Sequence, residues 1–145
     1  MPESRALADA EAVIIAHLAQ DAGLLVVLGS PAVGEEPIGA ELDETFPEAG
    51  EKFVQVFRAT STSVDPETGF IERCVLQVNS YGASKGEAWD VIAETTRALI
   101  DARTASHQGC VVTAVERLTG PSWSRDPSTN APRYTSSWAV TVHPA

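Results

Sequence analysis

The residues best suited to chemistry in this 145-residue chain do not assemble into a catalytic motif. His17, His107 and His143 fall in separate stretches, and none belongs to an HExxH zinc sequence. Neither GxxxxGK[ST] nor GxGxxG marks a phosphate-binding loop. The adjacent Glu35-Glu36 pair lies in an acidic stretch that is a poor setting for a tuned general acid. The sequence therefore predicts a protein that is not an enzyme and has no cofactor or metal site.

The two cysteines, Cys74 and Cys110, each lie within an apolar, strand-like run. No CxxC spacing indicates a zinc site. A free cysteine often behaves as a small buried apolar residue, which is what we expect of both. A disulfide between neighbouring strands stays open as the alternative, because the sequence does not show whether the thiols are close.

The chain carries a large excess of negative charge. Its formal net charge is −10 and its isoelectric point is about 4.6. Such a surface repels phosphate, so we expect no direct binding of DNA or RNA, although an acidic wall would let DNA slide past without adhesion. The N-terminus lacks the apolar region of a signal peptide and no apolar run approaches membrane-spanning length. We therefore expect a soluble protein made in the cytosol.

Residues 29–52 form an acidic loop that is long for a compact domain. Two interpretations stay open: a solvated charged loop, or an extended segment that lies on a neighbouring subunit. The second is favoured by three apolar residues spaced four apart, Ile38, Leu42 and Phe46. The carboxylates of the loop are Glu35, Glu36, Glu41, Asp43, Glu44, Glu48 and Glu51.

The N-terminal region predicts a helix followed by a strand. Residues 6–22 carry an amphipathic stripe on an alanine-rich background, and Gly23 is expected to end that helix. His17 lies beside an apolar residue on this helix, so we expect a structural role for it. The apolar run 24–28 is bounded by glycines and predicts a short strand.

A long hairpin is predicted next. Residues 53–60 and 71–81 alternate with the period of two that is typical of strands. Asp65-Pro66-Glu67-Thr68-Gly69 between them has the residues of a tight turn. The outer, polar half of the hairpin is expected to project, which makes Asp65, Glu67 and Phe70 candidate contacts for a partner.

A second helix is predicted over residues 85–105. Ser84 and Glu87 have the spacing of a capping box, in which each side chain bonds a backbone amide at the helix start. Trp89, near that start, is expected to anchor the core beneath the preceding strand. The apolar stripe of this helix is Ala88, Ile92, Thr95, Leu99 and Ala102.

The C-terminal region predicts a strand over 110–118, a long tip over 120–133, and a final strand over 134–142. Trp123 in the tip is either a partner contact or a side chain folded back on the domain edge. The further contact candidates of the tip are Arg125, Asp126 and Arg133. One face of the final strand is expected to be buried: Tyr134, Ser136, Trp138, Val140 and Val142.

This order of elements predicts a single α+β domain over residues 1–145. The expected core is an antiparallel or mixed sheet of about four to five strands, with two helices packed on it and loops that project.

The C-terminal stretch resembles a known family. Gly120-Pro121-x-Trp123-x-x-Asp126-Pro127, followed by Pro132-Arg133-Tyr134 and an alternating strand, is similar to the end of tail terminator proteins from long-tailed phages of actinobacteria. The upstream order of helix, strand and hairpin is similar too, as is Glu87-Ala88-Trp89-Asp90 in the second helix. The resemblance covers most of the chain and is weakest over 29–52.

The resemblance implies a structural virion protein, made in the host cytoplasm and located in the tail or neck. Such proteins form a ring, expected here to be a hexamer, that caps the tail tube, ends its polymerisation and joins the tail to the head. The implied partners are other copies of this chain, the tail tube protein and the head–tail connector. Genomic DNA would pass through the ring without specific binding.

Two alternatives accompany this hypothesis. One is a head-completion or neck adaptor protein of the same phage assembly. The other, from a different class, is a small-ligand-binding or hydrolytic α+β domain. That alternative requires a pocket in which His17, His107 or Trp89 meets carboxylates.

Overall fold

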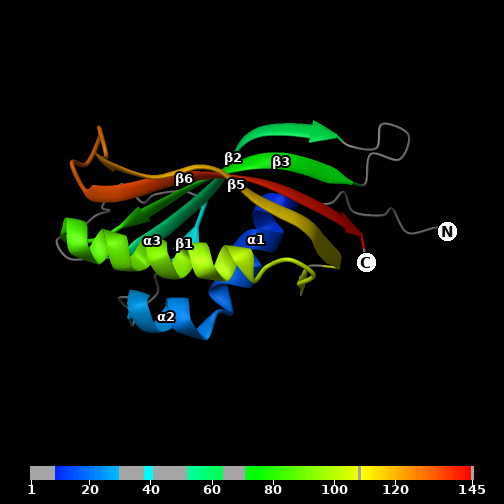
Figure 1. Ribbon diagram of the computed structural model, residues 1–145, viewed down its shortest axis with the longest axis horizontal. Helices are drawn as coiled ribbons and strands as arrows, with labels where there is room; N and C mark the ends of the chain where they lie inside the picture. Colours follow the sequence, from blue (N-terminus) through cyan, green and yellow to red (C-terminus); the bar gives the residue numbers. More distant parts are fainter. Residues whose placement is uncertain (1–8, 30–37, 41–51, 64–70, 108, 145) are drawn as a thin grey trace.

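One curled six-stranded sheet, with three helices on one of its faces, makes up the computed structural model, which describes residues 9–29, 38–40, 52–63, 71–107 and 109–144 (Figure 1). The strand order is β1-β2-β3-β6-β5-β4, and β1 with β2 is the only parallel pair among the described strands. The expected α+β class is confirmed, with more strands and helices than predicted. The elements are α1 (Ala10–Ala19), α2 (Ala22–Leu28), β1 (Ile38–Gly39), β2 (Phe53–Ser63), β3 (Glu72–Tyr81), α3 (Lys85–Ile100), β4 (Ser106–His107), β5 (Cys110–Arg125) and β6 (Pro132–Pro144).

The N-terminal region differs from its prediction. The first helix ends at Ala19, and the run 24–28, predicted as a strand, belongs to the helix α2. Asp21 explains the difference, because its carboxylate accepts the Leu24 amide at 2.9 Å and so starts a second helix, with Gly23 inside it. Leu24 and Leu28, four residues apart, are the side chains that α2 buries. An apolar run of five residues does not by itself distinguish a strand from one face of a helix.

Two arginines tie the N-terminal helices to the rest of the fold. Arg58 of β2 bonds Asp9, which caps α1, and Glu72 of β3. Arg97 of α3 bonds Asp21, which caps α2, and also two acidic neighbours on α3. These ion pairs raise the pKa of both guanidinium groups above the ordinary value, with hydrogen bonds to the carboxylates as the main cause. Sequence spacing alone did not indicate either set of partners.

The hairpin of β2 and β3 is confirmed, with Phe53 opposite Tyr81 at one end and Ser63 opposite Glu72 at the other. Val54 and Val56 are the buried side chains of β2, in agreement with the alternation in the sequence. The turn residues at the tip of this hairpin lie outside the described residues.

The helix α3 begins where its capping box predicts and ends at Ile100, five residues earlier than expected. Ser84 Oγ accepts the Glu87 amide at 3.2 Å, and the Glu87 carboxylate accepts the Ala83 amide at 3.0 Å. All five residues of the predicted apolar stripe are buried. The expectation that Trp89 anchors the core is wrong, because 46% of its surface is exposed.

The strands β5 and β6 extend much further than predicted. Residues 120–125, expected in a long tip, continue β5, and the turn between the strands shrinks to residues 126–131. The pairing continues through register shifts near Arg117 and Thr119, which let extra residues bulge from β5. Gly120 allows one of these shifts, since its φ is +90° and a Cβ there would lie 2.5 Å from the Thr135 carbonyl oxygen.

The hydrophobic core lies between the sheet and the helices. Trp138 is the largest of its fully buried side chains, and its indole Nε1 donates to Ser136 Oγ at 2.9 Å. The buried face predicted for the last strand is therefore confirmed. No single helix among the described residues has the length and apolar composition to cross a membrane. The pair α1 and α2 meets that test only when combined, across a 75° bend, and both helices contribute side chains to the core.

Candidate interface at the β5–β6 turn

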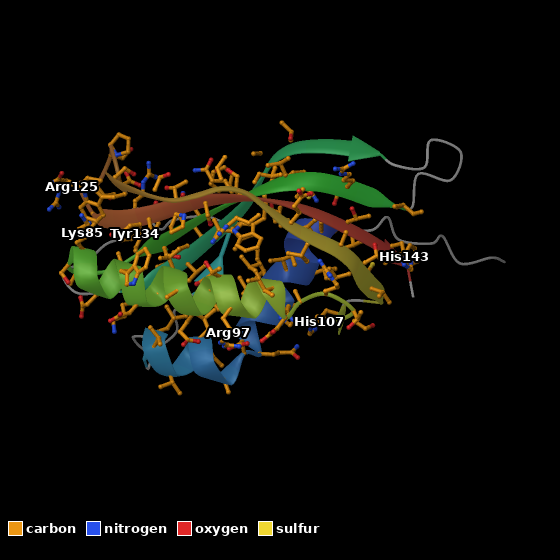
Figure 2. All side chains as sticks on the ribbon, viewed as in Figure 1. Lys85, Arg97, His107, Arg125, Tyr134 and His143 are labelled. Atoms are coloured by element: carbon orange, nitrogen blue, oxygen red, sulfur yellow. The ribbon has the colours of Figure 1, made fainter. Side chains whose placement is uncertain are left out.

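A cluster of aromatic and cationic side chains lies where β5 and β6 approach their connecting turn, beside the start of α3. We call it the tryptophan patch, and it consists of Lys85, Trp89, Trp123, Arg125 and Tyr134. Tyr134 is nearly buried between the two tryptophans, with ring centroids 5.2 Å from Trp89 and 5.5 Å from Trp123. Trp123 is 38% exposed, so two large indole rings are open to solvent side by side. Figure 2 shows Lys85, Arg125 and Tyr134 together at this end of the molecule.

Local structure explains why these residues meet. Trp123 lies directly opposite Tyr134 in the antiparallel pair of β5 and β6, so their side chains share one face of the sheet. Trp89 and Lys85 come from the first turns of α3, which the capping box places beside that face. The patch therefore combines an edge of the sheet with a helix start.

Charge distinguishes this patch from the rest of the acidic chain. Lys85 Nζ lies 5.1 Å from the ring centre of Trp123, and the Arg125 guanidinium carbon lies 5.8 Å from it. Within the described residues neither cation forms an ion pair with a carboxylate. Exposed tryptophans packed on a tyrosine and flanked by cations have the composition typical of protein interface hot spots. The arrangement is therefore suited to binding a partner protein.

The other two candidates of this region, Asp126 and Arg133, lie on the opposite face of the strand pair. Arg133 is opposite Ser124 in the register and donates to its Oγ at 3.1 Å. Asp126 accepts the Tyr81 hydroxyl at 2.9 Å and the amides of the turn that it begins. These contacts leave little of Asp126 exposed and give it the role of holding the turn.

The same contacts change two pKa values. For Asp126, burial acts to raise the pKa, but bonds from the turn amides and Tyr81, with the charge of Arg133, outweigh it and lower the pKa. Burial raises the pKa of Tyr81 to about 12, with Arg133 opposing and Asp126 adding to the shift. Tyr81 therefore stays protonated and Asp126 stays ionised at neutral pH.

The remaining contact candidates separate into two groups. Ile38 is 5% exposed in β1 and packs in the core of its own chain, which leaves little of it for a neighbour. All the other predicted contacts and acidic candidates lie outside the described residues: Asp65, Glu67, Phe70, Leu42, Phe46, Glu35, Glu36, Glu41, Asp43, Glu44, Glu48 and Glu51.

Two of the three histidines meet, which the sequence did not indicate. His17 Nε2 lies 2.9 Å from the Ala98 carbonyl, which can only accept, so this nitrogen carries the proton. His17 Nδ1 and His107 Nε2 share a hydrogen bond at 3.1 Å. Burial, with a smaller effect of His17, lowers the pKa of His107. Both nitrogens of His17 are thus used in structural contacts, and Trp89 lies in a different region.

The expectation that the sequence contains no catalytic motif, including no GxSxG, is wrong at Ser84. Residues 82–86 read Gly-Ala-Ser-Lys-Gly, which fits the GxSxG pattern of nucleophilic serines and lies between a strand and a helix. The structure assigns Ser84 to the N-cap of α3. His17 contacts Ala98 near the other end of this helix, about 21 Å along its axis from Ser84 at 1.5 Å per residue. His107 is at that far end with His17, so neither reaches Ser84.

The cysteines are free and buried. Burial, with the nearby charge of Glu72 adding to it, raises the pKa of the Cys74 thiol to about 12, so it is not an activated nucleophile. Among the described residues no three His, Cys, Asp or Glu side chains are grouped to hold a metal ion.

Comparisons with known proteins give a likeness in fold. No protein-family model matches the sequence, and no curated protein matches it. A solved structure that does match is a chain from the virion of a native gene transfer agent particle, with a TM-score of 0.64 and 18% sequence identity. The match covers 92% of this chain and 94% of that one, so the two share one fold over nearly their whole lengths.

Proposed function

We propose that this chain is a structural virion protein that binds its partners through the tryptophan patch. The observation that carries the proposal is the pair of exposed rings, Trp89 and Trp123, which contact Tyr134 edge-on and at a tilt beside two cations that pair with no described carboxylate. Soluble monomers seldom expose such a cluster unless a partner covers it. The virion role in this proposal is supported by the fold match, because the matched chain belongs to a virion.

The specific role that fits is that of a tail terminator, a ring of copies that caps the tail tube and joins it to the head. Residues Gly120–Tyr134 carry the resemblance to that family, and three of the five patch residues, Trp123, Arg125 and Tyr134, lie in this same stretch. A ring forms when one surface of each copy binds a different surface of the next and the rotation closes. The net charge of −10 suits a ring through which DNA passes without adhesion.

The mass of the purified chain tests ring formation. Native mass spectrometry and negative-stain imaging should show closed rings, alone or after the tail tube protein is added. A chain that stays monomeric at every concentration, with and without tube protein, refutes the proposal.

The position of the subunit in an intact particle tests the specific role. A tail terminator lies at the end of the tube, whereas a neck adaptor lies on the side of the portal. A cryo-electron microscopy reconstruction of the tail and neck separates the two, and absence of the chain from the particle refutes both.

A further inference from the structure

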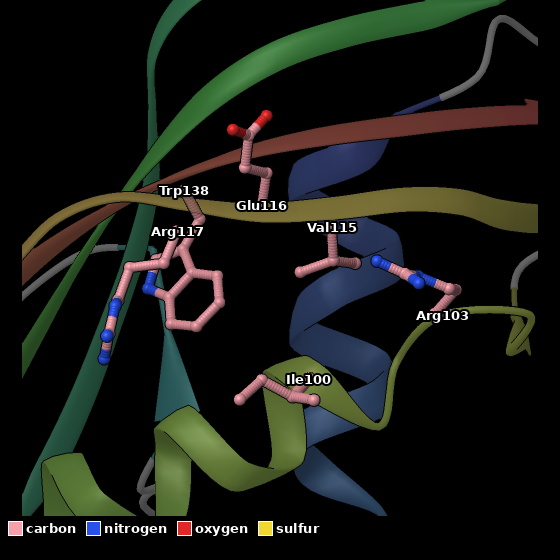
Figure 3. A pocket seen from close by; sticks show the side chains of 6 residues that line it. All are labelled: Ile100, Arg103, Val115, Glu116, Arg117 and Trp138. Atoms are coloured by element: carbon pink, nitrogen blue, oxygen red, sulfur yellow. The ribbon is translucent and has the colours of Figure 1, made fainter.

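An open groove beside the last turn of α3 provides a second surface, separate from the tryptophan patch. Its volume is about 440 Å³, and Figure 3 shows Trp138 as its floor between α3 and β5. Glu116 borders it but points to the other face of β5 (Figure 3). The side chains that line the groove itself, which we call the α3–β5 groove, are Ile100, Arg103, Val115, Arg117 and Trp138.

The groove is apolar with cations at its sides. Ile100 is 61% exposed and gives the groove an apolar wall that faces solvent. Arg103 and Arg117 form no ion pair with any described residue, whereas Arg58, Arg97 and Arg133 all do. In a chain of net charge −10, two arginines without carboxylates at one groove favour an acidic occupant with apolar side chains.

The edge of β5 beside the groove is open as well. β4 pairs only with Cys110 and Val111, and the backbone contacts of this edge with residues 104 and 105 stop at Val112. From there to Arg125 no described residue pairs with the outer edge of β5. An unpaired strand edge can accept another extended segment.

We infer that the α3–β5 groove binds residues 41–51 of a neighbouring copy of this chain. The segment reads Glu-Leu-Asp-Glu-Thr-Phe-Pro-Glu-Ala-Gly-Glu and so has the chemistry that the groove favours. Leu42 and Phe46 supply apolar side chains for the exposed Ile100, and Glu41, Asp43 and Glu44 supply charges for the two arginines.

The distance from β1 and β2 to the groove indicates that the segment binds the groove of a neighbouring copy and not its own. The segment leaves the sheet after β1 and returns at β2, at one edge of the sheet, and the groove borders β5. Four strand separations lie between β1 and β5 and three between β2 and β5, about 19 Å and 14 Å at 4.8 Å each. A segment of eleven residues with both ends held at β1 and β2 reaches only about 20 Å when fully extended. It would have little length left to lie along its own groove.

The ends of the segment, at β1 and β2, and the groove beside β5 lie towards opposite edges of one sheet, which gives the contact between copies a direction. Each copy would offer its segment on one side and its groove on the other, the head-to-tail arrangement that builds a ring. The inference rests on the proposed function, because the contact has a role in assembly only if copies form a ring. Binding of the segment to the groove can be measured without a ring.

A peptide of residues 40–52 tests the groove directly. Its binding is measured by fluorescence anisotropy to the full chain carrying Leu42→Ser and Phe46→Ser, so that no neighbour's segment competes for the groove. Arg117→Glu in that chain should weaken binding by about tenfold. Arg73→Glu, an equal change of charge at an exposed site on β3, should leave binding within about twofold. No binding, or equal loss in both variants, overturns the inference.

Assembly of charge-reversed copies tests the contact between chains. Neither Arg103→Glu/Arg117→Glu nor Glu41→Lys/Asp43→Lys/Glu44→Lys should form rings alone, whereas their equimolar mixture should, because each groove then meets a segment of opposite charge. Native mass spectrometry reads the result. Rings from the arginine variant alone overturn the groove contact and leave the ring proposal standing. A wild-type chain that binds the peptide at Arg117 yet stays monomeric refutes the ring and supports the groove.

Discussion

Replacement of Trp123 by alanine separates the role of the tryptophan patch in assembly from its role in folding. The indole contacts Tyr134, Lys85 and Arg125 within its own chain. The aromatic pair contributes about 1 kcal/mol and each exposed cation–π contact about 0.5 kcal/mol, so Trp123→Ala should lower the free energy of unfolding by about 2 kcal/mol.

For a chain of this length that loss corresponds to a decrease of about 4–8 °C in melting temperature. The transition should stay cooperative, because Trp123 is 38% exposed and lies outside the hydrophobic core, which keeps its buried side chains. Differential scanning calorimetry of the isolated chain measures this part of the effect.

The effect on assembly should be larger. Loss of a central aromatic hot spot costs 2 kcal/mol or more, which weakens ring association by about 30-fold or more. Sedimentation velocity over a dilution series measures it, with Leu118→Ala as the control, since Leu118 is 46% exposed on the same strand but outside the patch. Rings of Trp123→Ala that dissociate at the wild-type concentration refute the patch as an interface. Loss of the folded state would show that Trp123 belongs to the core.

Three further predictions concern the fold. The pKa of His107 is lowered in the folded state, so the unfolded chain binds more protons than the folded one at mildly acidic pH. The free energy of unfolding should therefore fall as the pH decreases from about 6.5 through that lowered pKa. Urea unfolding at stepped pH should show a smaller loss for His107→Gln than for the wild-type chain. Tyr81→Phe removes the hydroxyl that donates to ionised Asp126 and should cost about 2 kcal/mol, measured by urea unfolding at pH 7; an unchanged midpoint would contradict this. Gly120→Ala places a Cβ against the Thr135 carbonyl at a positive φ and should cost about 2–3 kcal/mol; equal thermal stability would refute that strain.

Periodic sequence patterns gave correct predictions where the structure depends on contacts within one helix or strand. The capping box at Ser84, the apolar stripe of α3 and the alternation in β6 all reflect contacts within a few residues or on one face of one element, and the structure has each of them. The N-terminal error has the opposite origin. Whether residues 24–28 form a strand or a helix depends on the Asp21 cap and on packing against α3, which a short apolar run does not encode.

The candidate interface was also predictable only in the part that depends on single residues. Composition indicated that Trp123 and Arg125 were unusual, but not that Trp89 and Tyr134 would join them, because that requires the register of β5 with β6 and the position of α3. Register also moved Arg133 to the other face of the sheet, where it supports the turn. Likewise, the meeting of His17 and His107 spans 90 positions in the sequence.

The sequence by itself determined the α+β class, the acidic character, the start of α3 and the buried face of the last strand, since these follow from residue types and local periods. The tertiary structure decided the strand order, the length of β5 and which aromatic and cationic side chains stand together on one surface. The physical reason is that strand pairing and helix packing join distant residues through shape and hydrogen bonds, and those contacts leave no periodic signal in the chain.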